Sequence, residues 1–153
     1  MRTLGNILWH FPFFGFVTAS LTYLLGLLLT VTVVAAPIGL GLMELGKLMF
    51  KPFGQSMVSK KDLNTPSNRL WDLYSGIVML LYLPFGIVLS IVTIVQIGLL
   101  FVSITGIPVA LVLAKSLGTF FNPVHKKCVP AAVVDELQRR KDEGDFERYL
   151  GGK

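Results

Sequence analysis

Four polar side chains stand in or beside long apolar stretches of this chain. Glu44 and Lys47 are three residues apart, Gln96 is the single amide in the middle of a second stretch, and Lys115 follows that stretch directly. An ionisable group inside a membrane segment is costly, so it usually pairs with another group or lines a polar path. The chemistry that these residues suggest is charge pairing or ion binding.

The residues needed for catalysis or metal binding do not converge. Cys128 is the single cysteine, which excludes an intrachain disulfide and a thiolate metal cluster. His10 and His125 lie far apart and form no helical ligand pair. The chain also lacks a phosphate-binding glycine loop and a nucleophile elbow. We therefore expect a protein that is not an enzyme and has no cofactor or metal.

Two long uncharged stretches indicate that the fold lies in a lipid bilayer. Residues 3–43 and residues 73–114 contain no Asp, Glu, Lys or Arg, and a soluble domain of 153 residues could not hide both from water. The net charge of +5 comes from basic residues that flank these stretches, where they suit anionic lipid headgroups. The composition predicts an integral membrane protein and no nucleic-acid partner.

Prolines divide each apolar stretch into a long and a short helix. A helix from about residue 13 to 36 precedes Pro37, which lacks a backbone donor and interrupts the helix. A helix from about 84 to 105 precedes Pro108 in the same way. The other expected elements are helices at about 38–51 and 109–121 and a polar loop at 55–72.

The two stretches match each other when the sequence is shifted by 71 positions. Thirteen of the 45 positions from Phe14 to Val58 are then identical, among them a Phe-Gly start, a proline in mid-stretch and a final Phe-x-Pro. The sequence therefore predicts an internal duplication, with one repeat at about 6–58 and the other at about 77–129.

Both repeats are flanked by basic residues, namely Arg2 itself, residues around Lys60 and residues beside Lys126. Because Lys and Arg in short segments next to membrane spans mark the cytoplasmic side, these segments and both chain ends are expected in the cytoplasm. The repeats are then parallel. The predicted fold is an all-α, multi-pass integral membrane domain over 1–129, made of two parallel helical hairpins with proline-broken helices, and a charged cytoplasmic helical tail over 130–153.

The tail has the pattern of a solvated helix. Glu136 and Arg140 are spaced i,i+4 in the favourable orientation, and Gly144 suits a C-terminal cap. A helix exposed to the cytoplasm and a helix that binds a partner both agree with this pattern.

Three segments carry a family resemblance. The opening MRTLGNILW, the Pro-Phe-Gly at 52–54, and the Gly-Ile-Pro-Val at 106–109 followed by Lys115 resemble the YccF-like family. This family is the inner membrane component domain of bacterial membrane proteins, and the resemblance covers residues 1–129. It implies a location in the bacterial inner (cytoplasmic) membrane and no particular biochemical activity.

The helix breaks have two interpretations. Pro37 and Pro108 can mark kinks that neighbouring helices tolerate. They can also mark broken helices whose amino ends, with free N–H groups and partial positive charge, point into a cavity. In the second case Gly39 and Gly106 would let the backbone approach a bound ion.

The charged pair and the amide are also open to two interpretations. Glu44 and Lys115 are equivalent at the 71-residue offset and opposite in sign. They either meet across the interface of the repeats and line a polar path, or extend to water at the cytoplasmic rim. Gln96 either forms a hydrogen bond between helices or lines a pore.

We expect the chain to form a homo-oligomeric small-ion channel or transporter, because about four membrane segments enclose too little volume for a path within one subunit. Helix amino ends and basic flanks favour small anions. The alternative is a non-conducting accessory or scaffold protein whose C-terminal tail binds a membrane protein partner. The expected partners are the lipid bilayer, further copies of the chain and a small anion.

Overall fold

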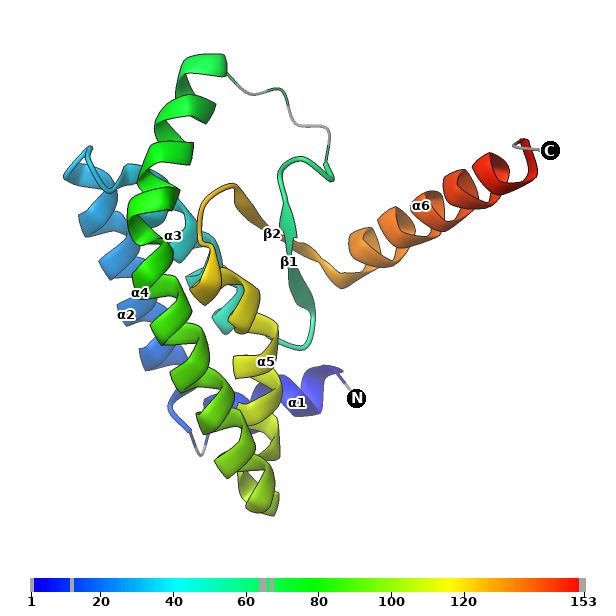
Figure 1. Cartoon of the computed structure of the whole chain (residues 1–153). Helices are drawn as coiled ribbons and strands as arrows, with labels where there is room; N and C mark the ends of the chain where they lie inside the picture. The colour runs from blue at the N-terminus through cyan, green and yellow to red at the C-terminus, as the bar shows by residue number, and fades with distance from the viewer. Residues whose placement is uncertain (1, 12, 64–65, 67, 152–153) are drawn as a thin grey trace.

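A computed structural model describes residues 2–11, 13–63, 66 and 68–151, which form a mostly helical fold (Figure 1). Residues 64, 65 and 67 of the expected loop, Met1 and the last two residues lie outside the described residues. In chain order the elements are α1 (Arg2–His10), α2 (Gly15–Val31), α3 (Ala36–Phe50), β1 (Gln55–Ser59), α4 (Arg69–Val102), the 3₁₀ turn η1 (Ile104–Gly106), α5 (Ile107–Phe121), β2 (Lys126–Pro130) and α6 (Ala131–Gly151).

Both expected proline breaks are confirmed. Pro37 and Pro108 lie in the first turns of α3 and α5, where a missing N–H costs nothing because it would have no helical partner. The chain reverses at each break, so α2 packs on α3 and α4 packs on α5 as two helical hairpins (Figure 1). The prolines therefore start the returning helices.

The second long helix starts earlier than expected. It was expected from about residue 84, but α4 begins at Arg69 and contains Pro84 in its interior. A proline inside an apolar helix is tolerated where neighbouring groups satisfy the freed carbonyl. Its 34 residues reach about 51 Å, and among the described residues α4 is the one helix long and apolar enough to cross a bilayer.

The all-α prediction is corrected by a two-stranded ribbon. β1 lies within the segment expected to be a loop, and it pairs in antiparallel register with β2. Five-residue strands give little periodicity, and each of these strands has its partner about 70 residues away. Local sequence patterns could therefore not reveal the ribbon.

The element bounds recur at the offset of the predicted duplication. Shifted by 71 positions, α2 covers 86–102 at the end of α4, while α3 and β1 coincide with α5 and β2. The shifted α1 falls at 73–81, inside α4. In the first half this helix is separate because the chain turns before α2, where Phe14 has a φ of 51°.

Equivalent helices run in opposite directions. The Tyr74 hydroxyl, near the start of α4, donates to the carbonyl oxygen of Val33 just after α2, at 2.6 Å. At the other end, Thr18 near the start of α2 borders a groove with Gln96 near the end of α4. If these helices stand across a bilayer, the two halves are inverted and not parallel.

A small core lies where α2 and α3 meet, centred on Leu45, Leu48, Met49 and Ala19. The outer faces of α2 and α4 are exposed and apolar, with Leu28 64% and Leu81 71% exposed. α6 leaves the ribbon and projects from the rest of the fold (Figure 1). Its expected pair between Glu136 and Arg140 is present at 3.0 Å, but α6 continues through Gly144, which is therefore not its cap.

Candidate functional site at the junction of the two halves

The ribbon brings the two halves together beside α3 and α5. Gly41 of α3 lies against the backbone just before β2, where a methyl group would collide with the carbonyl oxygen of Pro123. This close approach allows the α3 side chains one turn further on to reach β2. The glycine is therefore needed for the geometry of the site.

Glu44 extends from α3 to the strand of the other half. Its Oε2 accepts a hydrogen bond from the backbone N–H of Cys128 at 2.9 Å, and its Oε1 accepts one from Lys47 at 2.6 Å. The Glu44 side chain is 19% exposed and that of Lys47 is 49% exposed. A carboxylate with one backbone donor and one cation is a well-compensated charge.

Lys115 makes the reciprocal contact from α5. Its Nζ donates to the carbonyl oxygen of Pro52 at 2.7 Å and lies 5.7 Å from the centre of the Phe53 ring. Glu44 and Lys115, equivalent at the offset of 71, thus each cross to the backbone of the opposite half. The acid meets a donor in β2 and the base meets an acceptor before β1.

The structure places the other predicted residues elsewhere. Pro37 and Pro108 start helices at opposite ends of the bundle, so the two breaks do not share a cavity (Figure 1). Gly39 packs against Gly26 and Thr30, and a methyl group there would be 2.6 Å from the Gly26 carbonyl oxygen. Both breaks therefore turn the chain at the ends of hairpins.

The remaining two predicted residues lie on α4 and next to it. Gly106 packs on Leu100 at the turn into α5, where a methyl group would be 2.5 Å from the Leu100 carbonyl oxygen. Gln96 is exposed and borders an open groove of about 520 Å³ between α2, α4 and α5. The groove is lined mainly by apolar side chains, including Trp9 and Leu113.

Sequence reasoning missed the ribbon residues that complete the site. The Cys128 N–H and the Pro52 carbonyl are backbone groups, which no motif encodes. The Cys128 thiol lies 3.1 Å from Gln55 Oε1 on the facing strand. Among the described residues no group of three or more His, Cys, Asp or Glu side chains is arranged to hold a metal ion. The site can hold a carboxylate and an ammonium group against backbone partners of the opposite half.

Comparison with known proteins finds a family match over about the first third of the chain. Residues 4–55, which run from α1 to the first residue of β1, match the family model of the YccF inner membrane component domain. No curated protein and no solved structure matches the chain. The match supports association with the lipid bilayer and a location in the inner membrane. The predicted resemblance is confirmed over residues 4–55, the segment that matches this family model.

Proposed function

We propose that this protein is a homo-oligomeric channel or transporter for small ions, with anions favoured. The proposal begins from duplication: the element bounds recur after 71 residues, and equivalent helices run antiparallel. Duplicated halves of inverted orientation are a common construction of secondary transporters. In such proteins the ions bind where the halves meet. In this protein that is the region around Glu44 and Lys115.

The observation that carries the proposal is the position of the ribbon. β1 and β2 lie alongside α3 and α5 and not beyond the end of the bundle (Figure 1). If the bundle stands upright in the bilayer, the ribbon lies at membrane depth. Non-helical backbone is tolerated at that depth only inside protein or beside water. The ribbon therefore faces other subunits or an aqueous path.

The upright placement also indicates which end of the bundle faces the cytoplasm. Lys60, Lys61 and Arg69 lie near the end of the bundle where α4 starts, and Trp71 and Tyr74 suit the headgroup level there. We assign this end of the bundle to the cytoplasm. α1 lies at the opposite end (Figure 1), so the upright placement replaces the expected cytoplasmic N-terminus and parallel repeats with an inverted arrangement.

Ion flux tests the proposal directly. The purified chain is reconstituted into vesicles of phosphatidylethanolamine and phosphatidylglycerol loaded with KCl, and Cl⁻, K⁺, Na⁺ and H⁺ movements are recorded with ion-selective dyes. We expect chloride release, and a decrease of about tenfold in Lys115→Met, the ratio that about 1.4 kcal/mol produces. Lys51→Met, which changes an exposed residue at the end of α3, is the matched control. Vesicles that stay sealed to all four ions would contradict the proposal.

The second candidate is a non-conducting scaffold, which α6 favours. This helix has no buried residue and projects from the fold with Glu136, Arg139 and Arg140 paired along its surface (Figure 1). A bundle that lies in the plane of the bilayer would leave the ribbon and α6 on the cytoplasmic surface. Copurification of a membrane protein that is lost on removal of residues 131–153, together with sealed vesicles, would support this candidate.

A further inference from the structure

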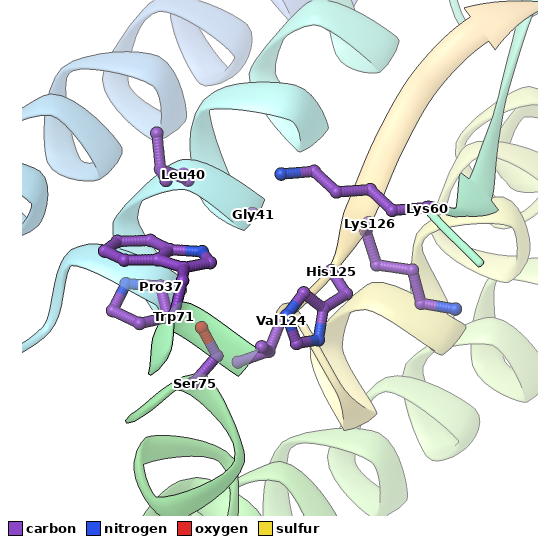
Figure 2. A pocket seen from close by; sticks show the side chains of 9 residues that line it. All are labelled: Pro37, Leu40, Gly41, Lys60, Trp71, Ser75, Val124, His125 and Lys126. Atoms are coloured by element: carbon purple, nitrogen blue, oxygen red, sulfur yellow. The ribbon is translucent and has the colours of Figure 1, made fainter. Parts of the chain in front are cut away.

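A small pocket lies between the start of α3, the first two turns of α4 and the end of the ribbon (Figure 2). Its volume is about 10 Å³, enough for one water molecule or one ion of similar size. Its lining comes from both halves and comprises Pro37, Leu40, Gly41, Lys60, Trp71, Ser75, Val124, His125 and Lys126.

Ser75 is the residue of this pocket whose buried hydroxyl lacks a hydrogen-bond partner among the described residues. It is completely buried in α4, and its Oγ has no hydrogen-bond partner in the described structure. A buried hydroxyl that lacks a partner is costly, so such groups usually bond to water or to a bound species. Figure 2 shows the Ser75 oxygen on the pocket side of α4, below Pro37 and Trp71.

Two further donors face the same space. Figure 2 shows the Trp71 indole nitrogen turned toward Gly41, and the Lys60 side chain extending over Gly41 from the end of β1. Within the described part of the chain neither nitrogen has a recorded protein acceptor. An indole N–H and an ammonium group only donate, and the Ser75 hydroxyl can donate as well. The pocket is therefore rich in donors.

The charges around the pocket are positive on balance. His125 Nε2 lies 3.2 Å from Asp72 Oδ1 at an ion-pair distance but without an aligned hydrogen bond. The Lys126 ammonium points away from the pocket in Figure 2, so its aliphatic stem forms the wall. The Asp72 carboxylate faces His125, and within the described part of the chain no ion pair is seen for Lys60.

Different side chains stand at the equivalent place in the other half of the molecule. At the offset of 71, Val124 corresponds to Phe53, and Ser75 corresponds to Leu4. Phe53 packs closely against α1, where a methyl group on Gly5 would lie 2.8 Å from its ring. A large ring therefore fills in one half the space that a valine and a serine leave open in the other. The pocket is a specific departure from the duplication.

We propose that this pocket binds one small inorganic anion of the halide class, held by Ser75 Oγ, Trp71 Nε1 and Lys60 Nζ. The three donors come from two elements, so the anion would join the first turns of α4 to the end of β1. Anion binding here does not depend on ion transport, because the pocket can be occupied in a protein that conducts nothing.

Bromide quenching of tryptophan fluorescence tests the site in the purified full chain. Trp71 lines the pocket, whereas Trp9, the other tryptophan, is only 4% exposed. The protein is prepared in detergent with gluconate as the anion and titrated with NaBr at constant ionic strength. We expect quenching that saturates, and a rise in the thermal unfolding midpoint over the same NaBr range, because a ligand stabilises the state that it binds.

Two variants and a matched control make the test specific. Ser75→Ala and Lys60→Gln are each expected to weaken bromide binding at least tenfold, and Lys60→Gln changes a partly exposed residue that does not endanger folding. Lys61→Gln removes the same charge from the exposed neighbouring position and is expected to bind as the wild type does. Quenching that rises linearly without saturation, as for a pocket that holds only water, would overturn the proposal. Equal binding by Lys60→Gln and Lys61→Gln would also overturn it.

Vesicle flux separates this proposal from the proposed function. Saturable bromide binding in a protein whose vesicles stay sealed would keep the anion site and reject the channel. Chloride flux without saturable bromide binding would keep the channel and reject the anion site.

Discussion

Met57 and Cys128 face each other in the antiparallel ribbon, and they are also equivalent residues at the offset of 71. An antiparallel pair of strands has a local two-fold axis that passes between facing residues. The local two-fold axis of the ribbon therefore passes between two residues that are also equivalent at this offset. Glu44 and Lys115 cross this axis in opposite directions, with opposite charge and opposite backbone partners.

The contact between Glu44 and β2 is expected to stabilise the fold. Glu44→Ala removes the acceptor of the Cys128 N–H and the ion pair with Lys47, and it should lower the free energy of unfolding by about 1–3 kcal/mol. Lys47→Met removes only the half-exposed partner and should cost about 0–1 kcal/mol. Denaturant unfolding of both variants measures the difference. Equal losses would mean that the bond to Cys128 contributes nothing.

Close contact at Gly41 predicts a sharp contrast between two glycine substitutions. Gly41→Ala would force a methyl group into the Pro123 carbonyl oxygen and should prevent the halves from docking. Gly98→Ala adds the same methyl group in α4, where nothing lies within 4 Å, and should raise stability by about 0.5–1 kcal/mol because alanine favours helix. Thermal unfolding monitored by circular dichroism compares the two. A Gly41→Ala protein as stable as the wild type would refute the docking geometry.

Attachment of α6 is expected to depend on pH. Lys141 of α6 lies 2.7 Å from Asp62, and its hydrogen bond and charge lower the pKa of that carboxyl below its ordinary value of 3.8. Because the pKa is lowered in the folded state, the contribution is complete above the ordinary pKa and is lost as the pH falls through the lowered value. A nitroxide at position 145 should therefore gain mobility only as the pH falls below about 4.

The control for this experiment is Lys141→Gln, which removes the cation. Its nitroxide should be mobile already at neutral pH and should respond little to acid. If the nitroxide is equally mobile in both proteins at neutral pH, the contact does not hold α6. Both side chains are substantially exposed, so added salt should also weaken the contact in the wild type.

Much of the helical architecture was predictable because its signals are local. Uncharged stretches mark the apolar helices, and a proline at the start of α3 or α5 acts within one helical turn. The early start of α4 was missed because Arg69, Asp72 and Pro84 suggested a loop and a later start. In the structure these residues occupy the exposed first turns and a tolerated interior position of one helix.

The site was predictable only in part, for a different reason. Glu44 and Lys115 attracted attention because a charge is conspicuous in an apolar segment. Their partners were hidden because they are backbone groups of a ribbon whose strands are distant in sequence. Ser75 and Val124 gave no signal alone; their meaning depends on Leu4 and Phe53, the residues at the equivalent positions.

The upright, inverted placement of the bundle is the central claim, and accessibility to an impermeant maleimide tests it most directly. Lys61→Cys and Ile104→Cys, both at exposed positions, are each built on Cys128→Ala and labelled in intact cells and in inverted membrane vesicles. The account predicts that position 61 reacts only in inverted vesicles and position 104 only in intact cells. Labelling of both positions from the same side would contradict it.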